Sequence, residues 1–155
     1  MKQTFSELEY RRPDVPAVLD TYRRLIAEAE AAADGAALVQ VYREHDAADR
    51  AWGFASSLCS IRHTLDTTDP FYDGENEFFD RNTPAVGNIQ LELYRALLAS
   101  PHRAALAEEF GGILLQNIRI HTAAVIAAHD APNQPVIFHD GLFTGIPVSF
   151  LRGPQ

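Results

Sequence analysis

The six histidines are the residues best suited to bind a metal or move a proton, so their neighbours matter first. A helical zinc-hydrolase motif reads His-Glu-x-x-His, which sets two imidazoles one turn apart with a glutamate beside them. The residue after each histidine is instead aspartate, threonine or arginine (His45, His63, His102, His121, His129, His139). The motif is therefore absent from the chain.

Partial metal sites are no better supported. His63 and Asp66 share one face of a predicted helix, but two ligands do not make a site. His121 and His129 lie about 12 Å apart along a helix, too far to share one metal. We therefore expect no metal-binding residue, no cofactor-binding residue and no catalytic residue in this chain.

Other common catalytic patterns are also missing. The sequence contains no G-x-S-x-G turn and no glycine-rich phosphate loop. The single cysteine, Cys59, lies on an apolar helical stripe, which favours a buried thiol over a nucleophile and excludes an intrachain disulfide. His45 lies on the same stripe and is interpreted as a hydrogen-bonded core histidine.

Arg62 is a charge at the end of that stripe, on a face that the pattern predicts to be buried. A buried guanidinium must be paired, because an unpaired one is very costly. Asp66 lies one turn away, and Asp69 and Asp73 follow closely. We predict a buried polar knot of these four residues at the corner between two helices. The alternative is that Arg62 binds a substrate carboxylate.

Composition excludes several classes of protein. The 155 residues include 46% hydrophobic and 22% charged residues, typical of one globular domain. The net charge of -8 argues against nucleic-acid binding, which needs a positive surface. No run reaches the ~18–20 apolar residues needed to cross a bilayer, and no signal peptide is evident. We expect a cytoplasmic protein with no membrane partner.

Hydrophobic periodicity predicts an all-α fold, an antiparallel bundle of about five helices. Asp14 and Asp69 are predicted N-caps, each followed by a proline in the first turn. The first helix is expected at about 15–33, and the second ends at about 65. The third runs over 70–99, a short fourth ends at 110, and the last covers about 113–129. Pro84 should kink the third. Leu58, Ile61 and Leu65 predict that the second helix is most buried near its end.

The last part of the chain differs in character. Residues 131–155 are rich in proline and glycine, and only Asp140 and Arg152 are charged. Short strands could form at 136–138 and 148–151, but two strands alone are marginal. We predict a helical domain over 1–130 and an irregular tail over 131–155.

The stretch 61–80, running from Ile61 to Asp80, closely resembles the N-terminal region of the oligoendopeptidase F family of zinc metallopeptidases. The opening at 5–14 and the segments 94–101 and 106–111 resemble the same family in the same order. The resemblance covers residues 4–130 and includes no catalytic residue.

The resemblance implies a helical lobe that forms part of the wall of a channel for short peptides. His63 and Tyr72 are then candidates for that wall. The zinc ligands of the intact family enzyme lie in a second lobe, so this chain alone is expected to be inactive and to bind no cofactor.

Alternatives remain open at this point. The chain could be a stand-alone helical module that binds peptides or proteins through an exposed apolar face, or a fragment with no function beyond folding. It could pair with a catalytic lobe or self-associate. The sequence does not decide between a fragment, a frameshifted product and a free-standing protein.

Overall fold

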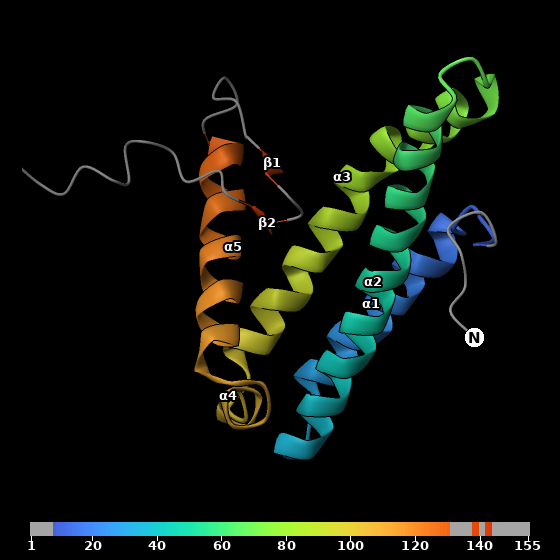
Figure 1. Ribbon diagram of the computed structural model, residues 1–155. Coiled ribbons are helices and arrows are strands. Elements are labelled where there is room, and N and C mark those ends of the chain that lie inside the picture. Colours follow the sequence, from blue (N-terminus) through green and yellow to red (C-terminus); the bar gives the residue numbers. More distant parts are fainter. Residues whose placement is uncertain (1–7, 131–137, 140–141, 144–155) are drawn as a thin grey trace, which may run out of the picture.

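The computed structural model describes residues 8–130, 138–139 and 142–143, with side chains described as far as Ala123. Five helices make up the body (Figure 1): α1 (Val15–Glu30), α2 (Gly35–Leu65), α3 (Pro70–Ala99), α4 (Ala104–Phe110) and α5 (Gly112–Asp130). The all-α prediction is confirmed. Two strands of two residues each, β1 (Phe138–His139) and β2 (Leu142–Phe143), pair in antiparallel orientation. The rest of the predicted tail lies outside the described residues.

Aspartate side chains start the three long helices. Oδ1 of Asp14 accepts from the Ala17 amide at 3.2 Å and Oδ1 of Asp34 from Ala37 at 2.8 Å. Asp69 caps α3 in the same way. These side chains satisfy amide groups that have no partner within the helix. The caps predicted at Asp14 and Asp69 are confirmed, although α1 ends at Glu30, slightly earlier than expected.

Two glycines meet special backbone demands. At Gly35, the first residue of α2, an added Cβ would lie 2.6 Å from Cβ of Ala105, so glycine allows α2 and α4 to approach closely. Gly111 has φ of +89° and ends α4, a conformation that favours glycine. The predicted end of the short helix at Phe110 is therefore confirmed.

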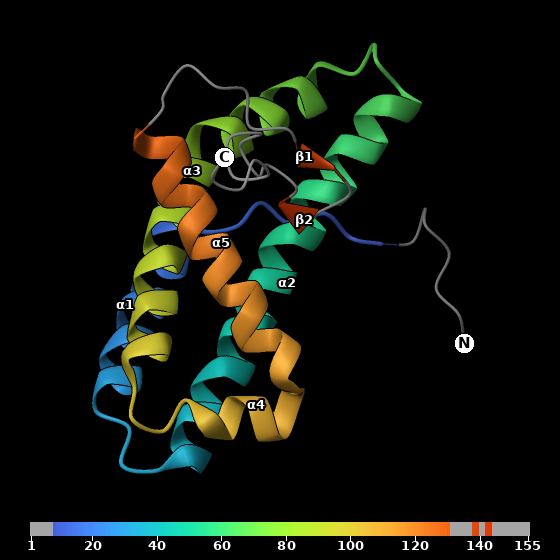
Figure 2. The same ribbon diagram turned by 90° about the vertical axis from the view of Figure 1, so that its left-hand side faces the viewer.

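The helix α3 bends part-way along its length, as the prediction of a kink near Pro84 requires (Figure 2). Proline has no amide hydrogen, so one helical hydrogen bond is missing at this point. The side-chain amide of Asn82 also donates to the carbonyl of Phe78 at 2.7 Å, within the same turn. The first half of α3 packs on α2, as in the contact of Phe79 with Trp52. The second half lies beside α1 (Figure 2) and also bonds to α2 through Tyr94 and His45.

The core lies where α1, α2 and α3 meet, with α4 across its base. It is mainly aliphatic and aromatic, and its fully buried side chains come from four helices (Tyr22, Leu25, Leu38, Cys59, Leu93, Leu97, Leu106). The helix α5 packs on α3 and α4 on another side of the body (Figure 2). Burial of these side chains is the main source of stability.

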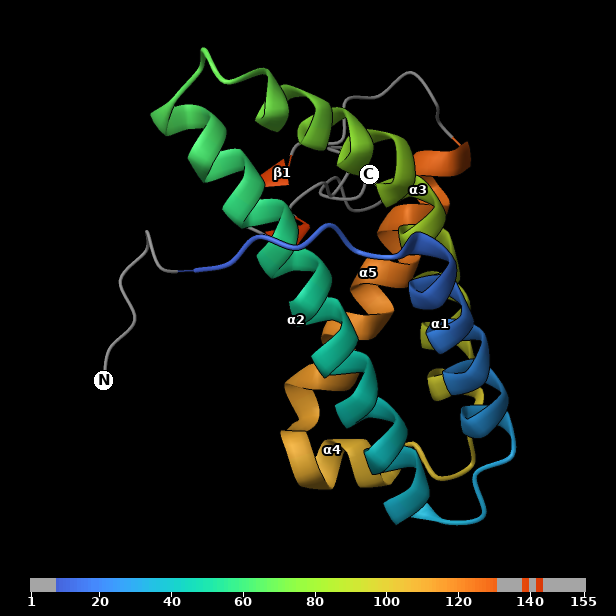
Figure 3. The same ribbon diagram turned by 90° about the vertical axis from the view of Figure 1, so that its right-hand side faces the viewer.

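One burial prediction is wrong. Leu58 is buried, but Ile61 is 48% exposed and Leu65 is 73% exposed, so the end of α2 is its less covered end. The reason is geometric: here α2 and α3 project together beyond the other helices (Figure 3). Cys59 faces α3, whereas Ile61 and Leu65 lie on the opposite side of α2.

Candidate functional site

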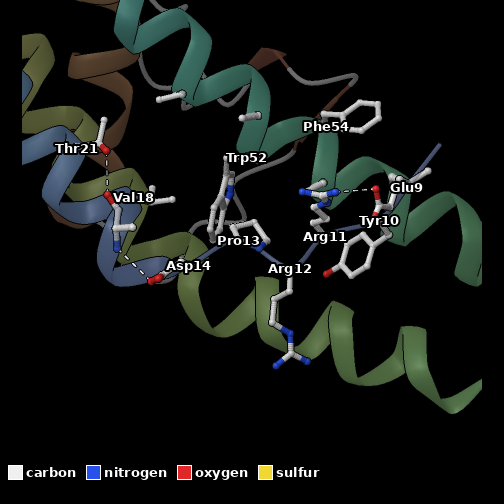
Figure 4. Close-up of a pocket in the computed structure, with 15 residues that line it drawn as sticks. Glu9, Tyr10, Arg11, Arg12, Pro13, Asp14, Val18, Thr21, Trp52 and Phe54 are labelled. Atoms are coloured by element: carbon white, nitrogen blue, oxygen red, sulfur yellow. Dashed lines mark hydrogen bonds and ion pairs between the residues drawn. The ribbon is translucent and has the colours of Figure 1, made fainter.

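A pocket of about 460 Å³ lies between the extended segment 9–14, α1 and α2. Its apolar wall on α2 is formed by Trp52, Phe54 and Leu58 together with alanines. The wall on α1 includes Val18. Figure 4 shows the Trp52 ring beside Pro13 of the extended segment. The pocket has the size and apolar character of a site for a side chain or a small ligand.

Charged groups at the rim of the pocket pair with each other. The guanidinium of Arg11 lies 2.9 Å from a carboxylate oxygen of Glu9, and both side chains are exposed. Figure 4 shows the Arg12 side chain directed away from the pocket, toward α3. The rim therefore carries no strong excess of either charge toward an occupant.

Glu75 holds the extended segment in place. This carboxylate is 2% exposed and accepts hydrogen bonds from the Arg12 Nε at 3.0 and 3.1 Å. It also accepts from Arg12 Nη2 and from the Tyr10 hydroxyl. The hydrogen bond from Arg12 is the main cause of a lowered pKa at Glu75, because it stabilises the charged form. Arg12 also lies 4.9 Å above the Phe78 ring.

The contacts of Glu75 with Arg12 and Tyr10, here called the Glu75 clamp, were not predicted from the sequence. The residue types gave one signal: Glu75 lies between Phe71 and Phe79 at helical spacing, so it is a charge on an otherwise aromatic stripe. Its partners are 63 and 65 residues away in sequence, and no periodicity links them. Burial and the bond to Glu75 raise the pKa of the Tyr10 hydroxyl, which therefore stays a donor.

Arg62, the centre of the predicted polar knot, is half-buried. Its guanidinium donates to the Leu8 carbonyl and lies 3.4 Å from the Tyr72 hydroxyl. It thereby ties the extended segment to the α2–α3 corner. Tyr72 is half-buried and its ring contacts those of Tyr10 and Phe71.

The three aspartates of the predicted knot serve local roles. Asp66 accepts from both the amide and the hydroxyl of Thr68, which lowers the pKa of Asp66. Asp69 caps α3. Asp73 lies 3.2 Å from Nδ1 of His63. The knot as one unit stays a prediction, as does the place of His63 and Tyr72 in a channel wall.

The thiol of Cys59 is enclosed by the core. Cys59 is fully buried, with Sγ 3.3 Å from Oδ1 of Asn76, and burial raises the pKa of its thiol. A raised pKa keeps the thiol protonated and unreactive. In the described part of the chain, no three side chains of His, Cys, Asp or Glu are grouped so that they could hold a metal ion. The described residues therefore offer no three-ligand set of the kind that a catalytic zinc requires.

The outer face of α2 carries an apolar band beside the pocket. Phe54, Ile61 and Leu65 are 52%, 48% and 73% exposed, and helical geometry places them within about 40° of one another around the axis. We call these three residues the α2 band. Within the described part of the chain, no helix is long and apolar enough to span a membrane.

The outer face of α1 is different. Its exposed charges form ion pairs, Arg23 with Asp20 at 2.5 Å and Arg24 with Glu28 at 2.8 Å. Arg24 also reaches Glu44 of α2 at 2.9 Å. A surface of this kind is well solvated without a partner, whereas the α2 band leaves large apolar side chains in water.

Comparisons with known proteins agree with this architecture. One solved structure, described as an oligoendopeptidase F, superposes with a TM-score of 0.74 at 31% identity; the match covers 78% of this chain and 21% of that one. A second, "PZ peptidase A with inhibitor 2", gives a TM-score of 0.67 at 23% identity and shows the same fold, covering 92% of this chain and 28% of that one. No curated protein sequence matched.

The chain thus spans about a fifth to just over a quarter of these two solved proteins. A family model described as the Peptidase M3 N-terminal domain matches residues 5–125, which include the extended segment, all of α1 to α4 and most of α5. The chain therefore belongs to the Peptidase M3 N-terminal domain family.

Proposed function

We propose that this chain is the non-catalytic N-terminal lobe of an oligoendopeptidase F-like zinc metallopeptidase and forms part of the wall of its peptide channel. The observation that carries the proposal is the family match over residues 5–125 in a chain that has no His-Glu-x-x-His. Hydrolysis by a metallopeptidase needs zinc ligands, a polarised water and a general base. In this proposal a second lobe supplies all three.

The α2 band supports a role for this lobe within a larger assembly. Large apolar side chains grouped on one helix face are typical of surfaces that another domain covers. The two solved relatives carry the corresponding unit within much longer chains. We therefore propose that the second lobe packs against the α2 band. Short peptides would bind only when both lobes are present. The assembled enzyme would act in the cytoplasm.

A chimera tests this proposal. Residues 5–125 would replace the corresponding region of the solved oligoendopeptidase F relative, and hydrolysis of a quenched fluorogenic peptide would be measured. We expect activity in the chimera, loss of activity with Ile61→Glu in the α2 band, and retained activity with the control Arg23→Glu on α1. A folded, zinc-loaded chimera without activity would contradict the proposal.

A stand-alone binding module is the second candidate, favoured by the pocket beside the α2 band. Trp52 is the only tryptophan and lines this pocket, so its fluorescence reports an occupant directly. Saturable quenching or enhancement by short apolar peptides, lost with Ala51→Glu at an exposed position that lines the pocket, would support the module. An unchanged spectrum up to millimolar peptide would remove it.

A further inference from the structure

A ring cluster occupies the point where α1, α2 and α3 meet, in place of purely aliphatic packing. His45 of α2 is 2% exposed, and its ring centroid lies 5.8 Å from that of Tyr22 on α1 and 5.2 Å from that of Tyr94 on α3. Tyr42 contributes a third ring at 5.5 Å. His45 therefore touches all three helices of the core.

One of the two ring nitrogens of His45 has a hydrogen-bond partner in the cluster. Its Nε2 lies 3.2 Å from the Tyr94 hydroxyl, and that oxygen also accepts from the Gln90 side-chain amide at 3.2 Å. The Tyr94 oxygen can accept from Gln90 and still either donate to Nε2 or accept from it, according to the tautomer of His45. A neutral ring whose proton is on Nε2 needs no donor or acceptor bond from Nδ1 to stay uncharged, whereas an imidazolium carries a proton on both nitrogens.

Two buried polar atoms of the cluster lack a hydrogen-bond partner among the described residues: Nδ1 of His45 and the hydroxyl of Tyr22. Tyr22 is 0% exposed. A buried imidazole without an acceptor at Nδ1 can remain neutral, but an imidazolium there would be charged, poorly solvated and incompletely bonded. The cluster therefore favours the neutral form of His45 over the imidazolium.

Charged groups face the cluster from α2 and α5. Asp49 and Asp46 favour the imidazolium, but Asp49 accepts from the Gln90 amide at 3.0 Å and Asp46 pairs with Arg50 at 2.9 Å. His121 of α5, whose ring packs on Tyr94, opposes it. Burial outweighs the two carboxylates and lowers the pKa of His45 below its ordinary value of 6.5.

We propose that His45 is a proton-sensitive lock on the helical body: neutral His45 holds α1 and α3 against α2, and uptake of one solvent proton on its ring releases this packing. The unfolded chain binds that proton more readily than the folded chain. The lock is therefore intact above about pH 6.5 and weakens as the pH falls toward the folded pKa. This inference does not depend on the peptidase proposal.

The test is urea unfolding of the full chain between pH 7.5 and 5, followed by Trp52 fluorescence. In this range the folding constant of the wild type should fall by up to tenfold for each unit by which the pKa of folded His45 lies below that of the unfolded chain. The variant His45→Gln should lose most of this dependence. The control His102→Gln, a half-buried histidine outside the cluster, should retain it.

The half-buried ring of His121 has its own lowered pKa, caused mainly by burial, so His121→Gln should remove only a part of the pH dependence. The NMR titration of the His45 ring proton in the wild type needs no variant and should give a midpoint below 6.5, with Tyr94 signals shifting in parallel. A midpoint at or above 6.5 would overturn the proposal. So would equal pH dependence in His45→Gln and the wild type.

Discussion

Replacing Glu75 by glutamine probes the clamp that holds the extended segment against α3. Glutamine keeps the shape of the side chain and removes its charge. In the native protein the buried carboxylate accepts from both Arg12 and Tyr10. Hydrogen bonds to a charged group contribute about 1.5–3 kcal/mol, against about 0.5–1.5 kcal/mol for neutral ones. With two partners this difference sums to about 2–3 kcal/mol, and rehydration of the exposed Arg12 side chain reduces the expected cost of Glu75→Gln to about 1–2 kcal/mol.

The cost falls within this range because the two sides of the clamp differ in exposure. The Glu75 side chain is 3% exposed and cannot regain water, whereas the Arg12 side chain is 56% exposed and can. Urea unfolding followed by Trp52 fluorescence is the assay. With a slope of about 2 kcal/mol per molar urea, we expect the urea midpoint to fall by roughly 0.5–1 M.

Glu77→Gln is the matched control, since Glu77 is exposed and lies two residues away on the same helix. It should shift the unfolding free energy by less than about 0.5 kcal/mol. The lowered pKa of Glu75 means that its contribution is present above its unfolded value of 4.5 and is lost as the pH falls through the folded pKa. Equal stability of Glu75→Gln and Glu77→Gln at pH 7 would refute the reasoning.

Four further substitutions test the packing and one N-cap. Gly35→Ala should destabilise the protein by about 1–3 kcal/mol, because the new Cβ would meet Ala105. The control Gly53→Ala, at a site with open space, should stabilise the protein by about 0.5–1 kcal/mol. If thermal unfolding showed Gly35→Ala to be the more stable variant, the α2–α4 contact would be contradicted. Leu97→Ala should cost about 2–5 kcal/mol, since Leu97 is 0% exposed, and a cost below 1 kcal/mol would argue against its burial. Asp34→Ala should cost about 1 kcal/mol through the lost N-cap, measured by the same unfolding curves; no loss would mean that the cap is redundant.

Much of the fold could be predicted because the relevant signals are local. Aspartates followed by proline marked the starts of α1 and α3, and Pro84 marked the bend in α3. The stripe on α2 identified His45 and Cys59 as buried. These predictions depend only on neighbours within a few residues.

Burial of the far end of α2 could not be predicted in the same way. Periodicity shows which side chains share a face, but it does not show whether another helix covers that face. Ile61 and Leu65 lie on the side of α2 away from α3, and the body ends before it reaches them. The apolar pattern therefore indicated a surface that is exposed in this chain.

The contacts of the candidate site depend on tertiary structure. The sequence singled out Arg62 as a charge on an apolar stripe, but its bond to the Leu8 carbonyl joins residues 54 apart and could not be read from that stripe. The Glu75 clamp and the Tyr94 bond to His45 likewise join distant segments. No spacing rule specifies such pairs, because they arise only when the helices pack.

The most direct test of the central claim combines zinc analysis with a peptidase assay on the purified chain. The account predicts less than about one-tenth equivalent of bound zinc after dialysis and no cleavage of a quenched fluorogenic peptide above the buffer rate, with or without added zinc. Stoichiometric zinc together with cleavage that a chelator abolishes would contradict it, because the chain would then hold a catalytic centre of its own.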